Sequence, residues 1–373
     1  MEAQGYIETK ARKAMFCAKD VTKAPMSHPR IYLDHAATTP ILPQVREVVG
    51  EALAQYANPS SQHAAGRAAR AALEEARAQV AAALGWQGTV LFTSGATESL
   101  ALAWQHSRGE RKFASAVEHP ALARLAGEAV IAVDGNGLVD PACLPPADLI
   151  AVQQVNNETG VIQPLAAIGQ AVRAGGGLLL ADCAQGAGKL ALPDADMIVV
   201  AGHKLGAPPG VGALLLRDLG MIAPGGGQER GYRAGTENLP YILGLAAALA
   251  AERGWLDRAA ALRAGLEREL QALGVEVVAQ AADRLPTIGA YRIAGVNASQ
   301  VLIRCDMAGI AISAGSACSS GSMKPSAVML AMGMTEAQAR EVFRVSIGRE
   351  TTPADLAALT TVVRAIAQRG RAA

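Results

Sequence analysis

The chain has 373 residues, of which 51% are hydrophobic, 18% are charged and 3% are aromatic, and its formal net charge is +1. This length can bury a large core and is typical of two domains. The near-neutral charge and the few aromatic residues argue against a partner that is nucleic acid or an anionic membrane. Five scattered cysteines, without metal-type pairs, argue against a disulfide framework and a zinc site.

Two further features concern the compartment. The longest apolar stretch, residues 242–251, is far shorter than the roughly 20 residues of a membrane-spanning helix, so it predicts a buried helix. Residues 1–25 are polar and lack the apolar region of a secretory signal. We therefore expect them to be a disordered or vector-derived leader, or a misassigned start. Reduced cysteines are typical of the cytosol, so we expect a cytoplasmic protein.

From Ile31 onward, short apolar runs alternate with alanine-rich helical segments, the first of which covers residues 62–84. Strands are predicted at residues 90–92, 129–133, 149–155, 178–181, 197–201 and 212–216. This alternation is typical of βα units and of a mainly parallel sheet. We therefore expect an α/β protein.

The pattern changes after about residue 240. Residues 238–273 predict one long helix, and the remainder alternates short strands with helices, the last at residues 352–368. We therefore expect a large domain over residues 26–250, whose first residues could join the other domain. A smaller C-terminal domain is expected over residues 251–373.

Three short motifs follow predicted strands, at the sheet edge where ligands gather in α/β proteins. The motif TSGATE, residues 93–98, offers backbone amides and hydroxyls at a helix start, which suits a phosphate, although an ordinary helix cap would look the same. Asp182 ends an apolar strand and needs a cationic partner, which a structural ion pair would also supply. Lys204 follows another apolar strand.

Burial of Lys204 would lower the pKa of its amine, as a Schiff-base lysine requires, whereas a surface lysine could also reach solvent from this position. A phosphate at a helix start, a carboxylate for a ring nitrogen and a lysine for an aldehyde together predict a site for pyridoxal 5′-phosphate. We therefore expect this cofactor.

A further motif, SAGSACSSG at residues 313–321, surrounds Cys318 with small residues. A cysteine kept for packing normally has bulky apolar neighbours, which this run lacks. The run predicts a mobile loop that carries a thiol. The alternative is an inert cysteine in a flexible turn.

The chain resembles the cysteine desulfurases, fold-type-I pyridoxal-phosphate enzymes of the class V aminotransferase superfamily. The matching segments run in family order: YLDHAATTP (32–40), NPSSQHAAG (58–66), LFTSGATES (91–99), VEHPA (117–121), VNNETGVIQP (155–164), ADCAQGAGK (181–189), AGHKLGAPPGVGAL (201–214), GGGQERGYRAGTEN (225–238), SAGSACSSG (313–321) and FRVSIGR (343–349). The resemblance implies a large domain with a mostly parallel seven-stranded sheet and a smaller α+β C-terminal domain.

The resemblance also implies a role for each matching residue. Lys204 would hold the cofactor covalently, Asp182 would keep its ring nitrogen protonated, and Gln185 would bond its phenolic oxygen. His119 would stack on the ring and take part in proton transfer. The residues that would hold the phosphate are Ala96, Thr97, His203 and, from the other subunit of a homodimer with shared active sites, Thr236. Asn157, near the cofactor, and Arg344 would bind the substrate carboxylate.

The implied reaction removes sulfur from L-cysteine, leaves a persulfide on Cys318 and releases L-alanine, so the protein would be a sulfurtransferase. Its sulfur would pass to an acceptor such as an iron–sulfur scaffold. The Cys318–Pro325 spacing matches the branch with a long cysteine loop, used by nitrogen-fixation and housekeeping iron–sulfur systems. No metal is expected in the resting enzyme, although Cys318 could transiently ligate an iron–sulfur cluster.

The chain departs from the family pattern at Ala201, where serine is common, and at its short tail after Arg349, which puts the scaffold partnership in question. Three alternatives stay open: a selenocysteine lyase, another class V enzyme such as an aminotransferase, and a non-catalytic partner subunit. An aminotransferase has no need of Cys318, and a decayed subunit would be expected to lose Lys204, Asp182 or His119.

Overall fold

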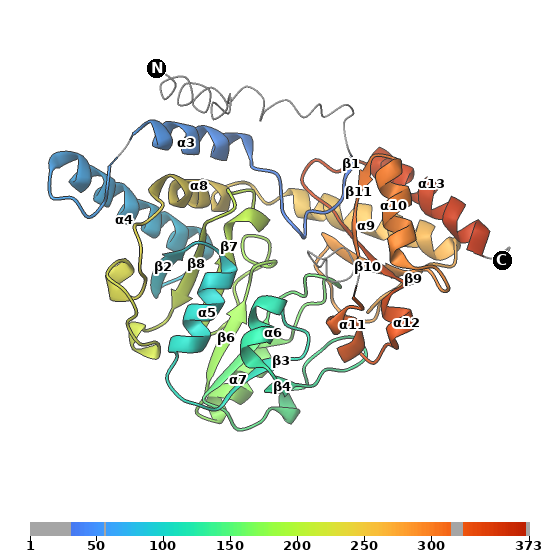
Figure 1. Ribbon diagram of the computed structural model, residues 1–373, viewed down its shortest axis with the longest axis horizontal. Coiled ribbons are helices and arrows are strands. Elements are labelled where there is room, and N and C mark those ends of the chain that lie inside the picture. Colours follow the sequence, from blue (N-terminus) through green and yellow to red (C-terminus); the bar gives the residue numbers. More distant parts are fainter. Residues whose placement is uncertain (1–30, 56, 315–323, 371–373) are drawn as a thin grey trace, which may run out of the picture.

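The computed structural model describes residues 31–55, 57–314 and 324–370, and its main feature is a seven-stranded sheet between helices (Figure 1). Its strands are, in spatial order, β2 (Thr89–Thr93), β8 (Gly212–Leu216), β7 (Met197–Ala201), β6 (Leu178–Asp182), β5 (Leu149–Gln153), β3 (Lys112–Ser115) and β4 (Val130–Ile131). β8 runs antiparallel to β2 and β7, and the other pairs are parallel. The expected mostly parallel seven-stranded sheet is therefore confirmed.

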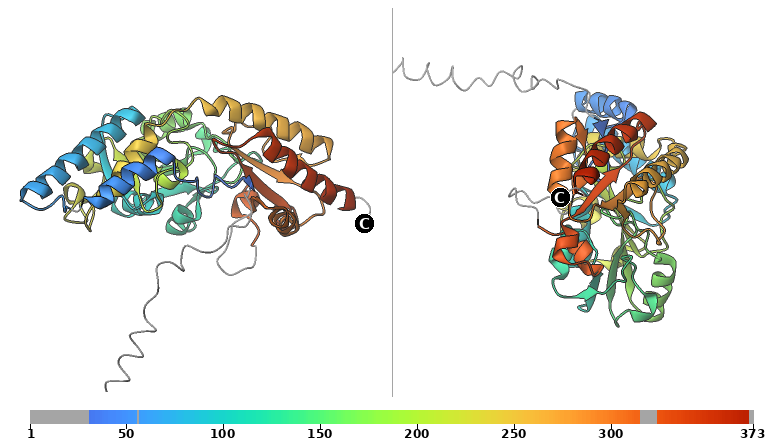
Figure 2. Two further views of the ribbon diagram at one scale, coloured as in Figure 1. Left: turned by 90° about the horizontal axis from the view of Figure 1, so that it is seen from above. Right: turned by 90° about the vertical axis from the view of Figure 1, so that its right-hand side faces the viewer.

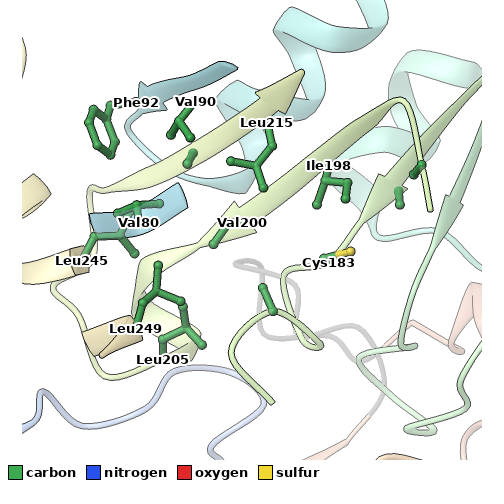
Figure 3. Close-up of a cluster of buried hydrophobic side chains, with 14 of the residues drawn as sticks. Val80, Val90, Phe92, Cys183, Ile198, Val200, Leu205, Leu215, Leu245 and Leu249 are labelled. Carbon is green, nitrogen blue, oxygen red and sulfur yellow. The ribbon is translucent and has the colours of Figure 1, made fainter. Parts of the chain in front are cut away.

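The sheet forms because its strands bury both faces. All five residues of β5, β7 and β8 are buried, as is typical of apolar strands covered by helices on both sides. Figure 3 shows one face, where Ile198, Val200 and Leu215 pack with Leu245 and Leu249. The intervening strand residues belong to a second core cluster on the opposite face.

Helices cover both faces of this sheet. One side carries α3 (Pro43–Ala54), α4 (Ala64–Leu84), α7 (Leu165–Ala174) and α8 (Leu239–Leu249), and the other carries α5 (Ala96–His106) and α6 (Pro120–Ala126). Short 3-10 turns lie at Pro141–Cys143, Gly202–Lys204, Leu219–Met221 and Glu229–Gly231. The turn at Gly202–Lys204 directly follows β7, and α5 begins shortly after β2. Both therefore open at one edge of the sheet.

A second, antiparallel sheet is built from the C-terminal part of the chain. It contains β12 (Ser313–Ala314), β13 (Val342–Ser346), β10 (Ile288–Arg292) and β9 (Glu276–Val277), in that order. Its helices are α9 (Trp255–Ala272), α10 (Ala298–Met307), α11 (Ala327–Ala331), α12 (Glu336–Ala339) and α13 (Pro353–Gly370). The helices α3 and α4 lie at one end of the elongated molecule, and α9 and α13 lie at the other (Figure 2).

The first described residues join this second part of the molecule. β1 (Ile31–Tyr32) pairs in parallel with β11 (Ile310–Ala311), and Asp34 forms a bridge with Ser346 of β13. The chain then continues to α3 over the large sheet. Residues 31–34 therefore lie beside β11 and β13, although they precede the large sheet in the sequence.

One prediction about the helices is wrong. Residues 238–273 form two helices, α8 and α9, with a break at residues 250–254. The break arises because the two helices serve different cores: α8 packs with α3 and α4, whereas α9 packs with α13. The domain limits at residues 26, 250 and 373 stay a prediction. Across the described residues, no helix combines the length and the apolar composition needed to cross a membrane.

Candidate active site

A cavity of about 530 Å³ lies where the carboxyl ends of β6 and β7 face the second sheet. Most of the predicted site residues line it: Ala96, Thr97, His119, Asn157, Asp182, Gln185, His203, Lys204 and Arg344. Thr236 is exposed and does not line this cavity. Cys318 lies outside the described residues, but Ser313 of β12 is part of the wall.

The start of α5 forms the anion-binding end of the cavity. The first amides of a helix have no partner within the helix and carry a partial positive charge. Gly95 precedes the helix with φ 149°, a backbone conformation that favours glycine. A Cβ atom on Gly212 would lie 2.7 Å from the Gly95 Cα, so a side chain at position 212 would displace this turn. The acid of this turn, Glu98, is paired with Arg233 at 2.9 Å, which offsets its repulsion of an anion.

Asp182 and Lys204 also line the cavity. Burial raises the pKa of Asp182, whose Oδ1 accepts one hydrogen bond from the Ala184 amide at 2.9 Å. Burial and, less strongly, the charge of Arg344 lower the pKa of Lys204 to about 8. The Lys204 amine donates to the carbonyls of Ala36 and, at 3.0 Å, Ala37. Near neutral pH, this lysine is therefore much closer to its free-amine form than an exposed lysine is.

Two neutral histidines flank the lysine. Burial lowers the pKa of His119, and the charge of Lys204 adds to this effect. Burial, followed by the charge of Lys204, lowers the pKa of His203 to about 4. His119 also caps α6, because its Nδ1 accepts from the Ala121 amide at 3.1 Å. This bond leaves the proton of the neutral ring on Nε2.

These groups fit pyridoxal 5′-phosphate. The helix start suits its phosphate, and the amine of Lys204 has a depressed pKa. Asp182 feels the charge of Lys204, but burial still raises its pKa, so a further cation from a ligand would stabilise its carboxylate. Gln185 donates from Nε2 to the Ala36 carbonyl at 2.9 Å, while its buried Oε1 has no partner in the described part of the chain. An orphaned polar atom beside the cavity is expected of a side chain that meets a ligand.

Arg344 reaches the cavity from β13 of the second sheet. Its Nη1 donates to the Asn157 carbonyl at 2.7 Å, and its Nη2 lies 2.7 Å from the Asp34 carboxylate. Its buried Nε has no hydrogen-bond partner within residues 31–55, 57–314 and 324–370. Asn157 thus contacts Arg344 through its backbone. A guanidinium with unused N–H groups at a cavity wall suits a carboxylate.

Two acidic residues of this region were missed by sequence reasoning. Asp34 lies in the motif YLDHAATTP and Glu118 in VEHPA, so the signal for both was their place in a motif. Glu118 is fully buried, and burial, together with the nearby charge of Asp182, raises its pKa well above the usual value. Burial thus favours the uncharged form of this carboxyl group more than it does for an exposed glutamate.

Ala201 ends β7 and lines the cavity with its methyl group. A methyl group cannot donate the hydrogen bond that a serine hydroxyl would give to a phosphate. We therefore expect Ala201→Ser to bind pyridoxal phosphate at least as tightly as the natural chain. The effect of Ala201 on affinity stays a prediction.

The pKa of Lys204 leads to an expected pH profile. Pyridoxal phosphate should react with Lys204 in cofactor-free protein at a rate that rises with pH and levels off above about 8. The lowered pKa places the free amine within this range, whereas an ordinary lysine is mostly protonated there. The rate is measured by trapping with cyanoborohydride and by mass spectrometry of the peptide. Nα-acetyl-lysine is the control, and a Lys204 midpoint near 10.5 would contradict the assignment.

Comparisons with known proteins give the family of the chain. The family model described as aminotransferase class-V matches residues 31–359. A cysteine desulfurase of Frankia sp. (strain EuIK1) is 39% identical, and the match covers 90% of this chain and 91% of that protein. The NifS-like protein of Rickettsia africae ESF-5 superposes with a TM-score of 0.82 at 31% identity, over 91% of this chain and 99% of that one.

Another solved structure, described as SspA in complex with cysteine, superposes with a TM-score of 0.75 at 28% identity and covers 86% of this chain and 100% of that one. The family model spans most of the chain, and the Frankia protein matches nearly all of it. This chain therefore belongs to the aminotransferase class-V family and, within it, to the cysteine desulfurases.

Proposed function

We propose that the protein is a pyridoxal-phosphate-dependent cysteine desulfurase. It removes sulfur from L-cysteine, releases L-alanine and holds the sulfur as a persulfide on Cys318. The observation that carries the proposal is the single cavity lined by Lys204, Asp182 and Arg344. Relatives named cysteine desulfurase that are 35–39% identical over most of the chain support the same reaction.

When bound, the cofactor supplies an electron sink for the negative charge that develops at the substrate Cα. Lys204 takes the Cα proton at Nζ, which its lowered pKa makes available as a base near neutral pH. The carboxylate of Asp182 pairs with the protonated ring nitrogen. Arg344 holds the substrate carboxylate, and His119 moves a proton at Nε2.

The sulfur step uses Cys318 as its nucleophile. The Cys318 thiolate attacks the substrate sulfur, a new S–S bond forms, and the bond between Cβ and sulfur breaks. The electron pair of the broken bond stays with the three-carbon fragment, which becomes L-alanine after protonation. The wall residue Ser313 supports this step, because β12 leads from the cavity into the segment that contains Cys318.

The test uses purified protein loaded with pyridoxal phosphate and supplied with L-cysteine and a thiol reductant. Alanine and sulfide are expected in equal amounts. A parallel reaction with L-selenocysteine distinguishes a selenocysteine lyase, which would strongly prefer that substrate. A non-catalytic partner subunit would form neither product, and transamination would yield a keto acid without sulfide.

We also propose that two copies of the chain share each active site. Thr236 follows a glycine-rich stretch and is exposed in the single chain, so it is free to reach the phosphate in a partner. Mixed dimers of inactive Lys204→Ala and inactive Thr236→Val subunits should regain activity, because one of their two sites contains both natural residues. Activity is measured on heterodimers purified with two different affinity tags.

Homodimers of each variant are the controls and should stay nearly inactive. Verified heterodimers without recovered activity would contradict the shared site. The shared site would also be contradicted if the Thr236→Val homodimer were fully active while the Lys204→Ala homodimer was inactive. Thr236 would then not be needed in the active site.

The sulfur acceptor is proposed to be a protein such as an iron–sulfur scaffold, and the compartment is proposed to be the cytoplasm. Transfer from Cys318 would serve iron–sulfur cluster assembly or the synthesis of other thio-cofactors. The identity of the acceptor is tested by incubating the protein with labelled cysteine in a native lysate and by finding which proteins acquire the labelled sulfur.

A further inference from the structure

The carboxylate of Asp34 joins two strands at the edge of the active-site cavity. Its Oδ1 lies 2.7 Å from Nη2 of Arg344, and its Oδ2 accepts from the hydroxyl of Ser313 at 3.3 Å. Ser313 and Arg344 are direct partners in the pairing of β12 with β13. One carboxylate therefore holds a side chain from each of these two strands.

The backbone around Asp34 is itself fixed. Asp34 forms a bridge with Ser346, which lies two residues after Arg344 on β13. The carbonyl of Asp34 accepts from the Ala37 amide at 3.0 Å and from the Tyr32 hydroxyl at 3.2 Å. The position of the carboxylate relative to Arg344 thus follows from main-chain contacts.

Asp34 acts from behind the cavity wall. Arg344 and Ser313 line the cavity, whereas Asp34 is not among the lining residues. The side chains of Arg344 and Asp34 are 11% and 18% exposed, so their ion pair is largely shielded from water. A shielded ion pair gives little net stability because both charges lose their hydration, and its value can instead lie in geometry.

The contacts of Arg344 leave a defined set of donors for a ligand. Asp34 holds Nη2 and the Asn157 carbonyl holds Nη1, so the plane of the guanidinium is fixed from two sides. The buried Nε–H has no hydrogen-bond partner among the residues that the structure describes. A carboxylate binds arginine best through two parallel N–H bonds, and a guanidinium that is already oriented loses less entropy on binding it.

We infer that Asp34 is the positioning residue that orients the guanidinium of Arg344 for the carboxylate of the amino-acid substrate. This inference rests on the proposed function, because it assigns Arg344 to that carboxylate. Through Ser313, the same carboxylate fixes the end of β12 beside the substrate. Asp34 therefore sets the preference for an α-amino acid over an amine without a carboxylate.

The test replaces Asp34 by asparagine, which keeps the size of the side chain and removes its charge. The dissociation constants of L-cysteine and of cysteamine, which lacks the carboxylate, are measured by titration of the cofactor absorbance in the loaded enzyme. We expect D34N to weaken L-cysteine binding about tenfold and to leave cysteamine binding within about twofold. The KM for L-cysteine should rise similarly, with a much smaller change in kcat.

A matched control comes from another ion pair of the same sheet. Glu341 lies 2.7 Å from Arg292, both side chains are 15% exposed, and neither residue lines the cavity. E341Q should lower the melting temperature without changing the ratio of the dissociation constants of L-cysteine and cysteamine. If Asp34 had only a general structural role, D34N would weaken the binding of both ligands, or it would lower the melting temperature without affecting binding.

A double variant tests whether Asp34 acts through Arg344. In an R344A background, D34N should change L-cysteine binding less than twofold, because the group that it orients is gone. Should D34N not fold, S313A carries the test, since it removes one of the two contacts of the Asp34 carboxylate. We expect S313A to reduce the preference for L-cysteine by roughly two- to threefold.

Three results would overturn the inference. Folded D34N could keep the natural ratio of the two dissociation constants, or the effects of D34N and R344A on L-cysteine binding could simply add. The natural protein could also bind L-cysteine and cysteamine equally tightly. The proposed function fails by a different result, which is the absence of alanine and sulfide from L-cysteine. The binding titrations are interpretable in either case, because they need no turnover.

Discussion

Lys204→Ala is expected to abolish turnover and to leave bound pyridoxal phosphate without a covalent attachment. In the proposed mechanism, the amine of Lys204 would both hold the cofactor aldehyde and take the Cα proton. Loss of a residue with two such roles should reduce kcat by a factor of about a thousand or more. The fold should persist, because Lys204 makes its polar contacts with two backbone carbonyls that water can reach through the cavity.

The measurement combines product analysis with borohydride reduction of the natural protein. Reduction should fix the cofactor on the peptide that contains Lys204, and the Lys204→Ala protein should release its cofactor on denaturation. Lys189 provides a stringent comparison. Burial and, less strongly, the charges of Lys204 and Arg349 lower the pKa of Lys189 to about 7, and it lines a smaller neighbouring cavity together with Lys204.

A depressed pKa alone therefore does not distinguish the two lysines, but their position does. Lys204 lines the large cavity with Asp182, and Lys189 does not. The matched variant Lys189→Ala should keep the covalent attachment at Lys204. Cofactor reduced onto Lys189 in the natural protein would contradict the assignment of Lys204.

The sheet-edge motifs were predictable because each depends on short-range pattern. Asp182 ends the apolar strand β6, and Lys204 follows the apolar strand β7, which is its neighbour in the sheet. Parallel strands bring their carboxyl ends to one edge, so residues placed there in the sequence meet in space. The sequence alone therefore predicts that Asp182 and Lys204 lie close together.

The substrate end could not be predicted in this way. Asp34 and Arg344 are 310 residues apart, and they meet because β1 pairs with β11 and Asp34 bridges to β13. A two-residue strand such as β1 carries too little pattern to reveal its partner. The break between α8 and α9 could not be predicted for a related reason. Both segments have a helical pattern, and the different cores against which they pack are formed by distant parts of the chain.

The electrostatic state of the site also depends on burial that the sequence does not display. Glu118 looks like an ordinary acid between Val117 and His119, yet burial and the nearby charge of Asp182 raise its pKa well above the usual value. Burial also acts on His203, whose pKa falls to about 4. The sequence therefore displays the titratable residues in and around the cavity, but not the pKa shifts that burial gives them.

Cys318→Ser is expected to keep cofactor and substrate binding and to lose sulfur transfer. Serine preserves the approximate size of the side chain, but its hydroxyl cannot accept sulfur as a persulfide. L-Cysteine should still change the absorbance of the bound cofactor. Alanine and sulfide formation should fall together, by about a hundredfold or more, because both depend on the same nucleophile.

The other cysteines of the described residues are poor substitutes. Burial raises the pKa of Cys183 well above the usual value and that of Cys305 to about 11, so both remain thiols at neutral pH. Cys143 is exposed, and its Sγ–H donates to the Asp140 carboxylate, which also raises its pKa. Cys143→Ser is therefore the matched control and should keep full activity.

Mass spectrometry after brief exposure to L-cysteine gives a second measure of the same step. One added sulfur atom is expected on the peptide that contains Cys318 in the natural protein and in Cys143→Ser. The added mass should be absent from Cys318→Ser, because none of the other cysteines in the described part of the chain lines the cavity. Sulfide released by Cys318→Ser at nearly the natural rate would exclude the persulfide route and would make direct elimination of sulfide the better mechanism for this cavity.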